Sequence, residues 1–496
     1  MDLKRSGGTE KPVGRRETRD RRPEGIEGGV EGFNRRASRA VADRELHDSI
    51  ALFTGKTLGG RGVNLATLPE APELRERAYH IKQETMANLG GYLEQMAGAI
   101  EARGGKVHFA GDGASVAEYI GGLAGRRGAK IITKSKSMAT EEIELNRRLE
   151  EDYPELGLEI VETDLGEWIA QLAGDTPSHI VGPILHMNKA RIARILSESA
   201  GEKLPPDVEA LAGYARRRLR EKFLASDIGV SGANFGVAET GTVCLVTNEG
   251  NGRLVTSVPP VHVVVIGIEK LVPRFRDLSV FTRLLARSGT GQRLTAYTNF
   301  ITGPRGAGEL DGPEELHVVF LDNGRSKLLG TPFEEALYCI RCGSCLNVCP
   351  VYRQTGGHAY GSTYSGPIGA VITPLLKGDE KSRDLPHASS LCGACSETCP
   401  VGIPLHELLV KLRNRQVDGG IAGKAEELVF KGFEKTMSSP KLYGLAKKAG
   451  RVAQKAVVKD GSVRPLPGPL SGWTDFRDLA PLARKSFGQL WREGIE

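Results

Sequence analysis

The chain has 496 residues, of which 26% are charged and 40% hydrophobic, and its formal net charge is +6. This length predicts two to four domains with cores of their own. The composition excludes a helical membrane protein, because the most apolar uncharged stretch, Leu254–Ile268, has 15 residues and contains two prolines. Since no secretory leader pattern opens the chain, we expect a cytoplasmic protein whose only membrane contact is through partners.

Residues 1–32 are expected to form a basic, disordered tail. Met1 to Pro23 contains eight Lys or Arg against four Asp or Glu, and the segment lacks apolar periodicity. A basic tail could bind nucleic acid or an anionic membrane surface. We expect a solvated extension and no nucleic-acid partner, because no aromatic residues are interleaved with the charges.

Residues 33–103 are expected to form a helical region. Tyr79–Glu101 is long and amphipathic, as is Asp207–Ser226 further along the chain. Either helix could dock a partner, although packing against the chain's own sheet is the commoner fate of such a helix.

Residues 104–325 alternate between short apolar runs and amphipathic stretches. We expect strands at Lys106–Ala110, Lys130–Lys134, Leu158–Asp164 and His179–Ile184. We expect helices at Ala114–Arg127, Glu141–Asp152 and Leu165–Ala173. This alternation predicts a parallel sheet covered by helices on both faces. Two further apolar runs, Gly236–Thr247 and Leu254–Ile268, are joined by a glycine-containing turn and predict a hairpin in or beside that sheet.

The carboxyl ends of the strands in such a sheet are where ligands bind. Two polar segments fall there and predict a pocket: Lys134–Met138, with Lys134 and Lys136 as anion-binding groups, and Ala238–Thr242, with Glu239 and Thr240. The alternatives are surface charge for the lysines and a buried salt bridge for Glu239.

Other candidate residues are expected to be structural. We interpret His179, His186 and His262 as hydrogen-bonded structural histidines rather than metal ligands, and Cys244, inside an apolar run, as a core residue. The motifs G-x-G-x-x-G after a strand, G-x-x-x-x-G-K-[ST] and G-x-S-x-G are absent. The sequence therefore gives no support for nicotinamide, nucleotide-hydrolysing or serine-hydrolase chemistry.

The other seven cysteines lie in two related motifs within residues 326–425. The first is Cys339, Cys342, Cys345 and Cys349 before a proline, and the second is Cys392, Cys395 and Cys399 before a proline. Three cysteines spaced by three residues, with a fourth before proline, are typical of a four-iron cluster. A tetrahedral zinc site normally combines two pairs of cysteines, so the third closely spaced cysteine of the first motif would have no role as a ligand. Phe333–Leu337 and Leu405–Val417 indicate a mainly helical, two-cluster ferredoxin-like domain.

In two-cluster ferredoxins the last cysteine of each motif binds the other motif's cluster. One cluster would then be held by Cys339, Cys342, Cys345 and Cys399, and a second by Cys349, Cys392 and Cys395. The position of its fourth cysteine is occupied by Ser389. Three outcomes stay open: a three-iron cluster, a four-iron cluster closed by Ser389 or water, or a four-iron cluster with an open iron. A serine alkoxide is a poor match for this chemistry.

The segment between the motifs, Gln354–Leu376, has no charged side chain from Asp, Glu, Lys or Arg and contains five glycines. Glycine allows close backbone approach, and amide donors near cluster sulfurs raise the reduction potential. The alternative is a long solvent loop.

Several short motifs follow one another in order along residues 33–496. They are Lys134–Met138, Glu141, Glu142, Asn146, Glu162–Gly166, Pro177–His179, Ala238–Gly241, Asp322–Arg325 and the run from Cys339 through Gly357–Tyr360 to Gly366–Gly369. Together they resemble the lactate-utilisation protein B family, the iron-sulfur component of a three-part bacterial system that oxidises L-lactate to pyruvate.

The resemblance implies an α/β domain like those of sugar-phosphate isomerases and CoA transferases over 104–325, then a two-cluster ferredoxin domain over 326–425. A helical extension is expected over 426–496. The resemblance also implies two 4Fe-4S clusters, partner subunits and an electron acceptor, and the same cysteine-poor second motif.

We therefore expect an oxidoreductase-complex subunit that transfers electrons and leaves substrate catalysis to a partner. Two alternatives remain. The α/β domain could itself be a transferase or hydrolase acting on an acyl or phosphorylated substrate with Glu239 in the reaction, or the protein could be an iron-sulfur redox sensor whose basic tail binds nucleic acid.

Overall fold

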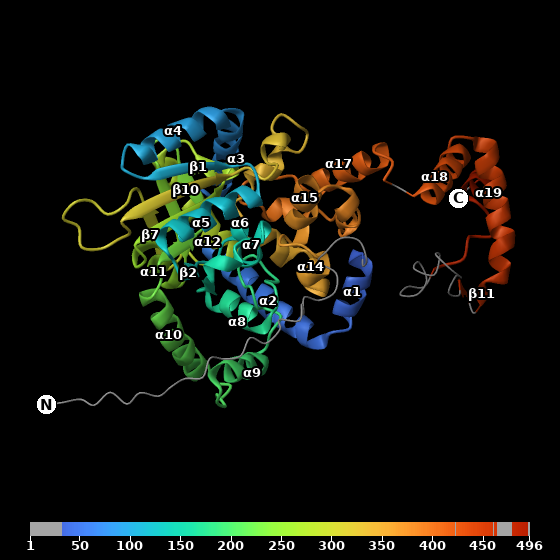
Figure 1. The fold of residues 1–496 in the computed structure, drawn as a ribbon. Coiled ribbons are helices and arrows are strands. Elements are labelled where there is room, and N and C mark those ends of the chain that lie inside the picture. Colours follow the sequence, from blue (N-terminus) through green and yellow to red (C-terminus); the bar gives the residue numbers. More distant parts are fainter. Residues whose placement is uncertain (1–31, 422, 460, 464–478, 495–496) are drawn as a thin grey trace. The chain divides into compact units, whose positions relative to one another are not determined.

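The computed structural model describes residues 32–421, 423–459, 461–463 and 479–494 (Figure 1). The predicted basic tail falls almost entirely outside these residues. The described chain forms two compact bodies, one ending at Gln416 and one starting at Val417. The first body contains the sheet and all eight cysteines.

A six-stranded, all-parallel sheet forms the centre of the first body. Its strands, in spatial order, are β1 (Lys106–Ala110), β10 (Glu315–Leu321), β7 (Val261–Gly267), β4 (Ile228–Ser231), β2 (Ile131–Lys134) and β3 (Glu159–Glu162). The predicted parallel α/β fold is confirmed. Every residue of the central strand β7 is buried, as expected for a parallel strand covered on both faces.

The two faces of the sheet belong to different cores. Val261, Val263 and Val265 pack with α5 (Gly113–Arg127) and α7 (Leu145–Asp152). The helix α5 begins where Asp112 accepts a hydrogen bond from the Ser115 amide, and it ends at the left-handed Gly128.

On the opposite face, Val264 and Ile266 enter a core that also contains Met96 of α4 and five of the buried cysteines (Cys342, Cys345, Cys349, Cys395 and Cys399). The cysteine region therefore shares a core with this face of the sheet. It is not a separate ferredoxin attached by a linker.

The helices of the first body cover the sheet and build the cysteine region (Figure 1). Around the sheets they are α3 (Ala71–Ala87), α4 (Leu89–Glu101), α6 (Met138–Glu142), α8 (Leu165–Ala173), α9 (Lys189–Ala200), α10 (Val208–Leu224), α11 (Asn251–Ser257) and α12 (Leu278–Gly289). The first two helices, α1 (Phe33–Val41) and α2 (Arg44–Ala66), pack against the cysteine region, and α2 also packs against α12. In the cysteine region they are α13 (Ser344–Val348), α14 (Pro350–Thr355), α15 (Gly366–Lys377), α16 (Ala394–Thr398) and α17 (Leu405–Asp418).

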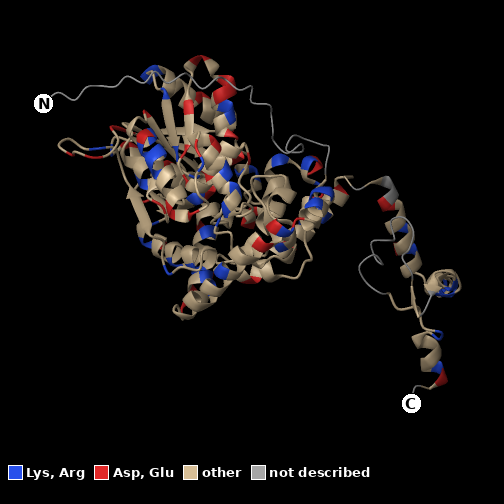
Figure 2. Ribbon diagram, turned by 90° about the horizontal axis from the view of Figure 1, so that it is seen from below, with Lys and Arg blue, Asp and Glu red and all other residues tan. Residues whose placement is uncertain are grey.

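The second body contains α18 (Lys424–Met437), α19 (Pro440–Ala453) and α20 (Phe487–Glu493), with a short antiparallel pair, β11 (Val458–Lys459) and β12 (Ser462–Val463). Figure 2 shows Lys and Arg interspersed with Asp and Glu along the described helices.

One predicted strand, His179–Ile184, is wrong. The residues form a tight turn instead, in which Nδ1 of His179 accepts hydrogen bonds from the amides of Val181 (3.0 Å) and Gly182 (3.1 Å). The strand that pairs with β2 toward the centre of the sheet is β4, which the sequence analysis did not predict.

The predicted hairpin is also wrong. Leu254–Ile268 begins inside the helix α11 and continues into the central parallel strand β7. The antiparallel pair is formed within the other run, between β5 (Phe235–Val237) and β6 (Thr242–Thr247). These two strands belong to a second, four-stranded sheet of order β8-β5-β6-β9, completed by β8 (Leu271–Val272) and β9 (Tyr297–Ile301). Cys244 lies in β6 with no exposed surface, as predicted for a core residue.

Two predicted helices are interrupted. The amphipathic stretch Tyr79–Glu101 is divided at Asn88 between α3 and α4. The stretch Glu141–Asp152 is divided by Glu144, whose φ of 52° places it in the left-handed region and ends the short helix α6.

A buried ion network joins the sheet region to the first cysteine motif. Arg325 donates to both carboxylate oxygens of Glu142, at 2.8 and 2.7 Å, and to Glu269 at 2.6 Å. Glu269 is also paired at 3.4 Å with Arg341, which lies between Cys339 and Cys342. Tyr364, from the segment between the motifs, donates to Glu142 at 2.6 Å.

The charges in this network stabilise one another. Burial disfavours each charged form, but the guanidinium of Arg325 holds the pKa of Glu142 below its usual value. The pKa of Glu269 falls to about 2, although burial opposes this, because the charges of Arg325 and Arg341 stabilise its carboxylate.

Glu142→Gln should destabilise the fold strongly, because Arg325 would lose an anionic partner in a buried site. Removing one partner of a buried ion pair costs about 3 kcal/mol or more. Chemical unfolding followed by circular dichroism measures this loss. Glu151→Gln, at an exposed position, is the matched control and should change stability by less than about 0.5 kcal/mol. Equal stabilities for the two variants would contradict the role given to the network.

Candidate iron-sulfur centre

The two cysteine motifs have the same backbone conformation. Arg341 and Leu391, each directly before the second motif position, have positive φ values of 58° and 53°. Gly343 and Gly393 follow that position with φ of 77° and 81°, and each starts a five-residue helix, α13 or α16. Each helix is followed by a cysteine and a proline. Superposed in this register, Ser389 takes the place that Cys339 has in the first motif.

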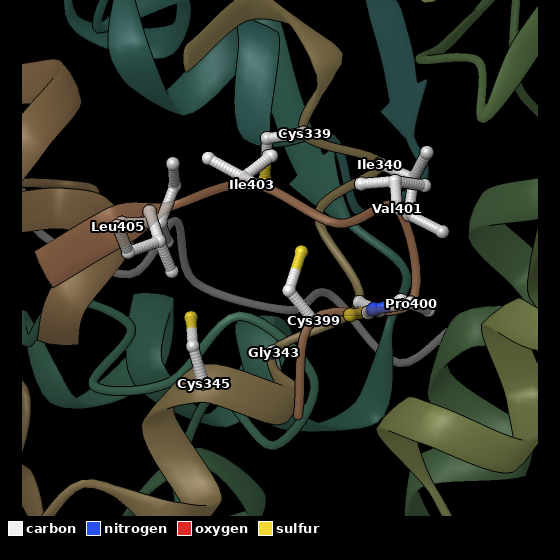
Figure 3. A pocket seen from close by; sticks show the side chains of 11 residues that line it. Cys339, Ile340, Gly343, Cys345, Cys399, Pro400, Val401, Ile403 and Leu405 are labelled. Atoms are coloured by element: carbon white, nitrogen blue, oxygen red, sulfur yellow. The ribbon is translucent and has the colours of Figure 1, made fainter. Parts of the chain in front are cut away.

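The structure brings Cys399 of the second motif to three cysteines of the first. Cys339, Cys342, Cys345 and Cys399 line one small cavity, and in Figure 3 the labelled sulfur atoms point into the opening between them. The rest of its lining is mostly apolar: Ile340, Gly343, Ile368, Pro400, Val401, Ile403 and Leu405. Cys345 and Cys399 are only 8% and 7% exposed, so little water reaches these sulfurs.

Burial of these thiols disfavours their ionisation. It raises the pKa of Cys342 and Cys345 far above the usual value and that of Cys399 to about 11, and neighbouring cysteine charges add to the effect. Four thiols so close together, three of them buried, suit a bound cation core, which stabilises thiolates.

Backbone amides donate hydrogen bonds to the sulfurs and so reduce the free-energy cost of ionising these thiols. The amide of Arg341 donates to Sγ of Cys339 at 3.4 Å. Backbone hydrogen bonds from Ile368 to Cys345, and from Val401 and Ile403 to Cys399, lower the pKa of those thiols. Such donors are the usual means by which a protein stabilises cluster thiolates.

The remaining three cysteines form a second group. The charges of Cys349 and Cys392 act on the pKa of Cys395, which burial raises to about 11. Cys349 and Cys395 are buried, whereas Cys392 is exposed. The pKa of Cys392 is lowered, first by the amide of Ala394 and then by the Ser390 side chain. One group is therefore enclosed and the other reaches the surface.

Ser389 repeats the hydrogen bond that Cys339 makes. The Leu391 amide donates to Oγ of Ser389 at 3.1 Å, just as the Arg341 amide donates to the sulfur of Cys339. The serine hydroxyl thus stands in its motif where the first cysteine sulfur stands in the other.

The segment between the motifs is not a solvent loop, and that alternative is wrong. Its second half forms the helix α15, whose first nine residues are buried. At Gly369 a side-chain carbon would lie 2.2 Å from the carbonyl oxygen of Tyr364, so only glycine allows this approach. The close packing brings the Ile368 amide to Cys345.

The predicted pocket residues do not form one pocket. Lys134 follows the expected strand β2, but it is 1% exposed and its Nζ lies 2.8 Å from both Glu141 and Glu162. It is neither a surface charge nor a free anion-binding group. Glu239 is exposed in the loop between β5 and β6 of the other sheet, where it accepts a hydrogen bond from the Phe275 amide at 2.9 Å.

Thr240, beside Glu239, donates to the Thr242 hydroxyl at 2.7 Å. Lys136 lies next to Lys134 in sequence, but its Nζ is buried and has no hydrogen-bond partner among the described residues. Of the four predicted pocket residues, only Lys136 has a buried side-chain atom without a hydrogen-bond partner among the described residues.

All three predicted structural histidines are hydrogen-bonded through at least one ring nitrogen. His262 Nε2 lies 2.8 Å from the Ser231 hydroxyl, and His186 lies 2.7 Å from the Ser178 hydroxyl and 3.1 Å from the Asp175 carboxylate. His179 uses Nδ1 in its turn. Nε2 of His179 and Nδ1 of His262 have no partner within hydrogen-bond distance among the described residues. Burial lowers the pKa of both His179 and His262 to about 3, so both are neutral at pH 7.

Family models match three consecutive stretches of the chain. They are the LUD domain over residues 93–321, the 4Fe-4S dicluster domain over 335–403, and the C-terminal domain of lactate utilisation protein B over 412–495. A relative named lactate utilization protein B from Bacillus licheniformis is 47% identical, with 94% of this chain and 97% of that protein covered.

The chain belongs to the lactate utilization protein B family. Relatives of the same name from Bacillus subtilis and Geobacillus kaustophilus are 45% and 48% identical, over 93% and 84% of this chain and 96% and 87% of theirs. A crystal structure of a DUF162 family protein from Deinococcus radiodurans aligns with 47% of this chain and 98% of its own length, at 14% identity and a TM-score of 0.24. The family resemblance found in the sequence is thus confirmed.

Membership of this family assigns the general role and the domains of the protein. This is an iron-sulfur protein of lactate utilisation, with a LUD domain built on the parallel sheet and a helical 4Fe-4S dicluster domain after it. Within the described ranges, every helix is too short or too polar to cross a bilayer.

Cys399→Ser and Cys244→Ser should have different effects on iron content. The first removes a sulfur from the enclosed cavity and should lower the iron and labile sulfide per chain, because serine oxygen is a poor ligand for this chemistry. The second lies in the core of the other sheet and should leave the iron content unchanged. Iron and sulfide assays on anaerobically purified protein make the comparison, and equal iron loss in both variants would contradict the grouping.

Proposed function

We propose that this protein is the iron-sulfur electron-transfer component of a multi-subunit system that oxidises L-lactate to pyruvate. The observation that carries the proposal is the crossed arrangement of the cysteines, in which Cys399 meets the first motif and Cys349 meets the second. Two adjacent groups of this kind are the arrangement of a two-cluster electron carrier.

The first cluster would be held by Cys339, Cys342, Cys345 and Cys399, and the second by Cys349, Cys392 and Cys395. We infer that both are of the 4Fe-4S type. When bound, such clusters accept and release single electrons. The donor sets fit, because both supply closely spaced sulfurs with amide donors aimed at them.

The chain's own residues give the two sites different roles. The apolar lining around Cys345 and Cys399 excludes water, and the amides there favour the more negative, reduced state of a cluster. The second site reaches the surface at Cys392. Electron exchange with a partner subunit or acceptor is therefore proposed at the second site, with the first site deeper in the path.

The fourth position of the second site is assigned to Ser389, because its hydroxyl matches the place of the Cys339 sulfur. Ser389→Cys should make the second cluster more resistant to air, since a thiolate binds iron of this kind better than an alkoxide. Ser279→Cys, at an exposed position outside both cysteine motifs, is the matched control and should give no such gain.

Iron content after timed air exposure measures the Ser389 effect. The expected end point for Ser389→Cys is about eight iron atoms per chain, as in two four-iron clusters. Equal air sensitivity in both variants and the wild type would remove Ser389 from the ligand position.

The proposed function is tested by purifying the protein anaerobically with its partner subunits and adding L-lactate while following the cluster absorbance. Bleaching with partners present and none with the isolated chain is the expected result, because substrate oxidation belongs to a partner. A colourless protein that contains zinc in place of iron and labile sulfide would overturn the proposal.

A further inference from the structure

Three cationic side chains from the N-terminal helices lie around the first group of cysteines. Arg61 comes from α2, and Arg75 and Lys82 come from α3. The family models that match this chain begin at residue 93, so both helices lie before the matched domains. Their charged residues therefore need an explanation of their own.

One face of α3 packs against the segment that leads into the first cysteine motif. Arg75, Tyr79 and Lys82 are spaced by four and three residues, so they share a face of the helix. Tyr79 makes an edge-to-face contact with the ring of Tyr338, at a centroid distance of 5.3 Å. Tyr338 directly precedes Cys339. The face that carries the two cations is therefore the face that contacts the cysteine region.

The two arginines bind the backbone on the other side of the same site. The guanidinium of Arg75 donates to the carbonyl oxygens of Cys399 at 2.7 Å and of Ser396 at 2.8 Å. Burial raises the pKa of Cys399, and the positive charge of Arg75 opposes that effect. Arg61 donates to the Thr398 carbonyl at 3.4 Å, and its Nε is buried with no hydrogen-bond partner among the described residues.

Lys82 is buried with only neutral oxygens as hydrogen-bond partners. The residue is 1% exposed, and its ammonium donates to the backbone carbonyls of Glu269 and, at 3.3 Å, of Leu271. Burial lowers the pKa of Lys82 to about 7, and the charge of Lys270 lowers it further. The negative charges of Glu269 and Cys339 oppose this shift.

Positive charge around the first site exceeds negative charge. Within the described ranges, none of the three cations forms an ion pair with a carboxylate. The carboxylate of Glu269 is already paired with Arg325 and Arg341. A buried cation without an anion is costly, so this excess indicates a site built for a negatively charged group.

Each cation acts on a different cysteine of the first group. Arg75 acts on Cys399, and Lys82 interacts with Cys339. Burial lowers the pKa of Arg61, and the charge of Cys342 opposes that effect. At the second site, by contrast, the main charges that act on the cysteines are those of other cysteines. The compensating positive charge is therefore directed to the first site.

We propose that Arg61, Arg75 and Lys82 raise the reduction potential of the cluster held by the first group of cysteines. Four thiolates around an iron-sulfur core leave a net negative charge, which increases by one when the cluster accepts one electron. Fixed positive charges near the sulfurs stabilise that reduced form more than the oxidised form. The proposal rests on the proposed function for the presence of the clusters, and it makes the first cluster the one that accepts an electron more readily.

Redox titration of the anaerobic, cluster-loaded full chain, followed by EPR, measures the potential of each cluster. Lys82→Met removes the buried charge and keeps the volume. It should shift the first cluster to a more negative potential by about 59 mV or more, which is a tenfold change in the equilibrium constant of a one-electron couple. Arg61→Gln should cause a smaller shift in the same direction, because Arg61 is partly exposed and solvent screens its charge. The second cluster should keep its potential in both variants.

Three further variants complete the experiment. Lys56→Met, at an exposed position in α2, is the matched control and should leave both potentials at their wild-type values. Arg61→Lys keeps the charge and should keep the wild-type potential, a result that a purely structural role of the arginine does not predict. Cys392→Ser, at the exposed cysteine, assigns the transitions, because the one that it changes belongs to the second cluster.

The wild-type titration decides the proposal even if a variant fails to load its clusters. The first cluster should be reduced at the less negative potential of the two, and the reverse order would overturn the proposal. An unchanged or less negative potential of the first cluster in loaded Lys82→Met would also overturn it. Either result in protein with loaded clusters removes this inference alone, whereas a protein without iron and labile sulfide removes the proposed function.

Discussion

The buried ion network around Arg325 is the interaction on which the arrangement of the molecule depends. Glu142 comes from the helical segment after β2, Glu269 follows β7, and Arg341 lies between two cysteines of the first motif. Arg325 follows β10, so the network joins four segments, and each desolvated charge is compensated by a partner from another segment. The network therefore fixes the cysteine loop against the sheet, and Asn347 of that region meets His179 of the sheet domain.

A shared core accompanies the network. Five buried cysteines belong to the same apolar core as Val264 and Ile266 of the sheet. The dicluster domain is therefore held by the LUD domain along a broad surface, and the enclosed cysteine group is the one that faces the sheet. This arrangement gives the chain a dry site beside the sheet and a second site that reaches solvent at Cys392. The proposed electron path, between a buried and an exposed site, rests on this difference.

Much of the site could be predicted from the sequence. The spacing of the cysteines predicted their grouping, and the missing cysteine pointed to Ser389, because ligand spacing is a local property of the chain. The pocket was predicted less well. Lys134 and Glu239 are both polar residues after apolar runs, yet one is buried in ion pairs and the other is exposed on a different sheet. Glu167 was missed because nothing in its local sequence marks its carboxylate as buried without a hydrogen-bond partner among the described residues.

The sequence by itself determined the parallel α/β fold, the two cysteine motifs and the family, since periodicity and motif spacing are written along the chain. Only the tertiary structure decided that Leu254–Ile268 supplies the central strand, that His179 lies in a turn, and that Arg341 of the first cysteine motif pairs with Glu269. These features depend on strand pairing and burial between residues that are far apart in the chain. A local sequence pattern does not determine which of these distant residues come into contact.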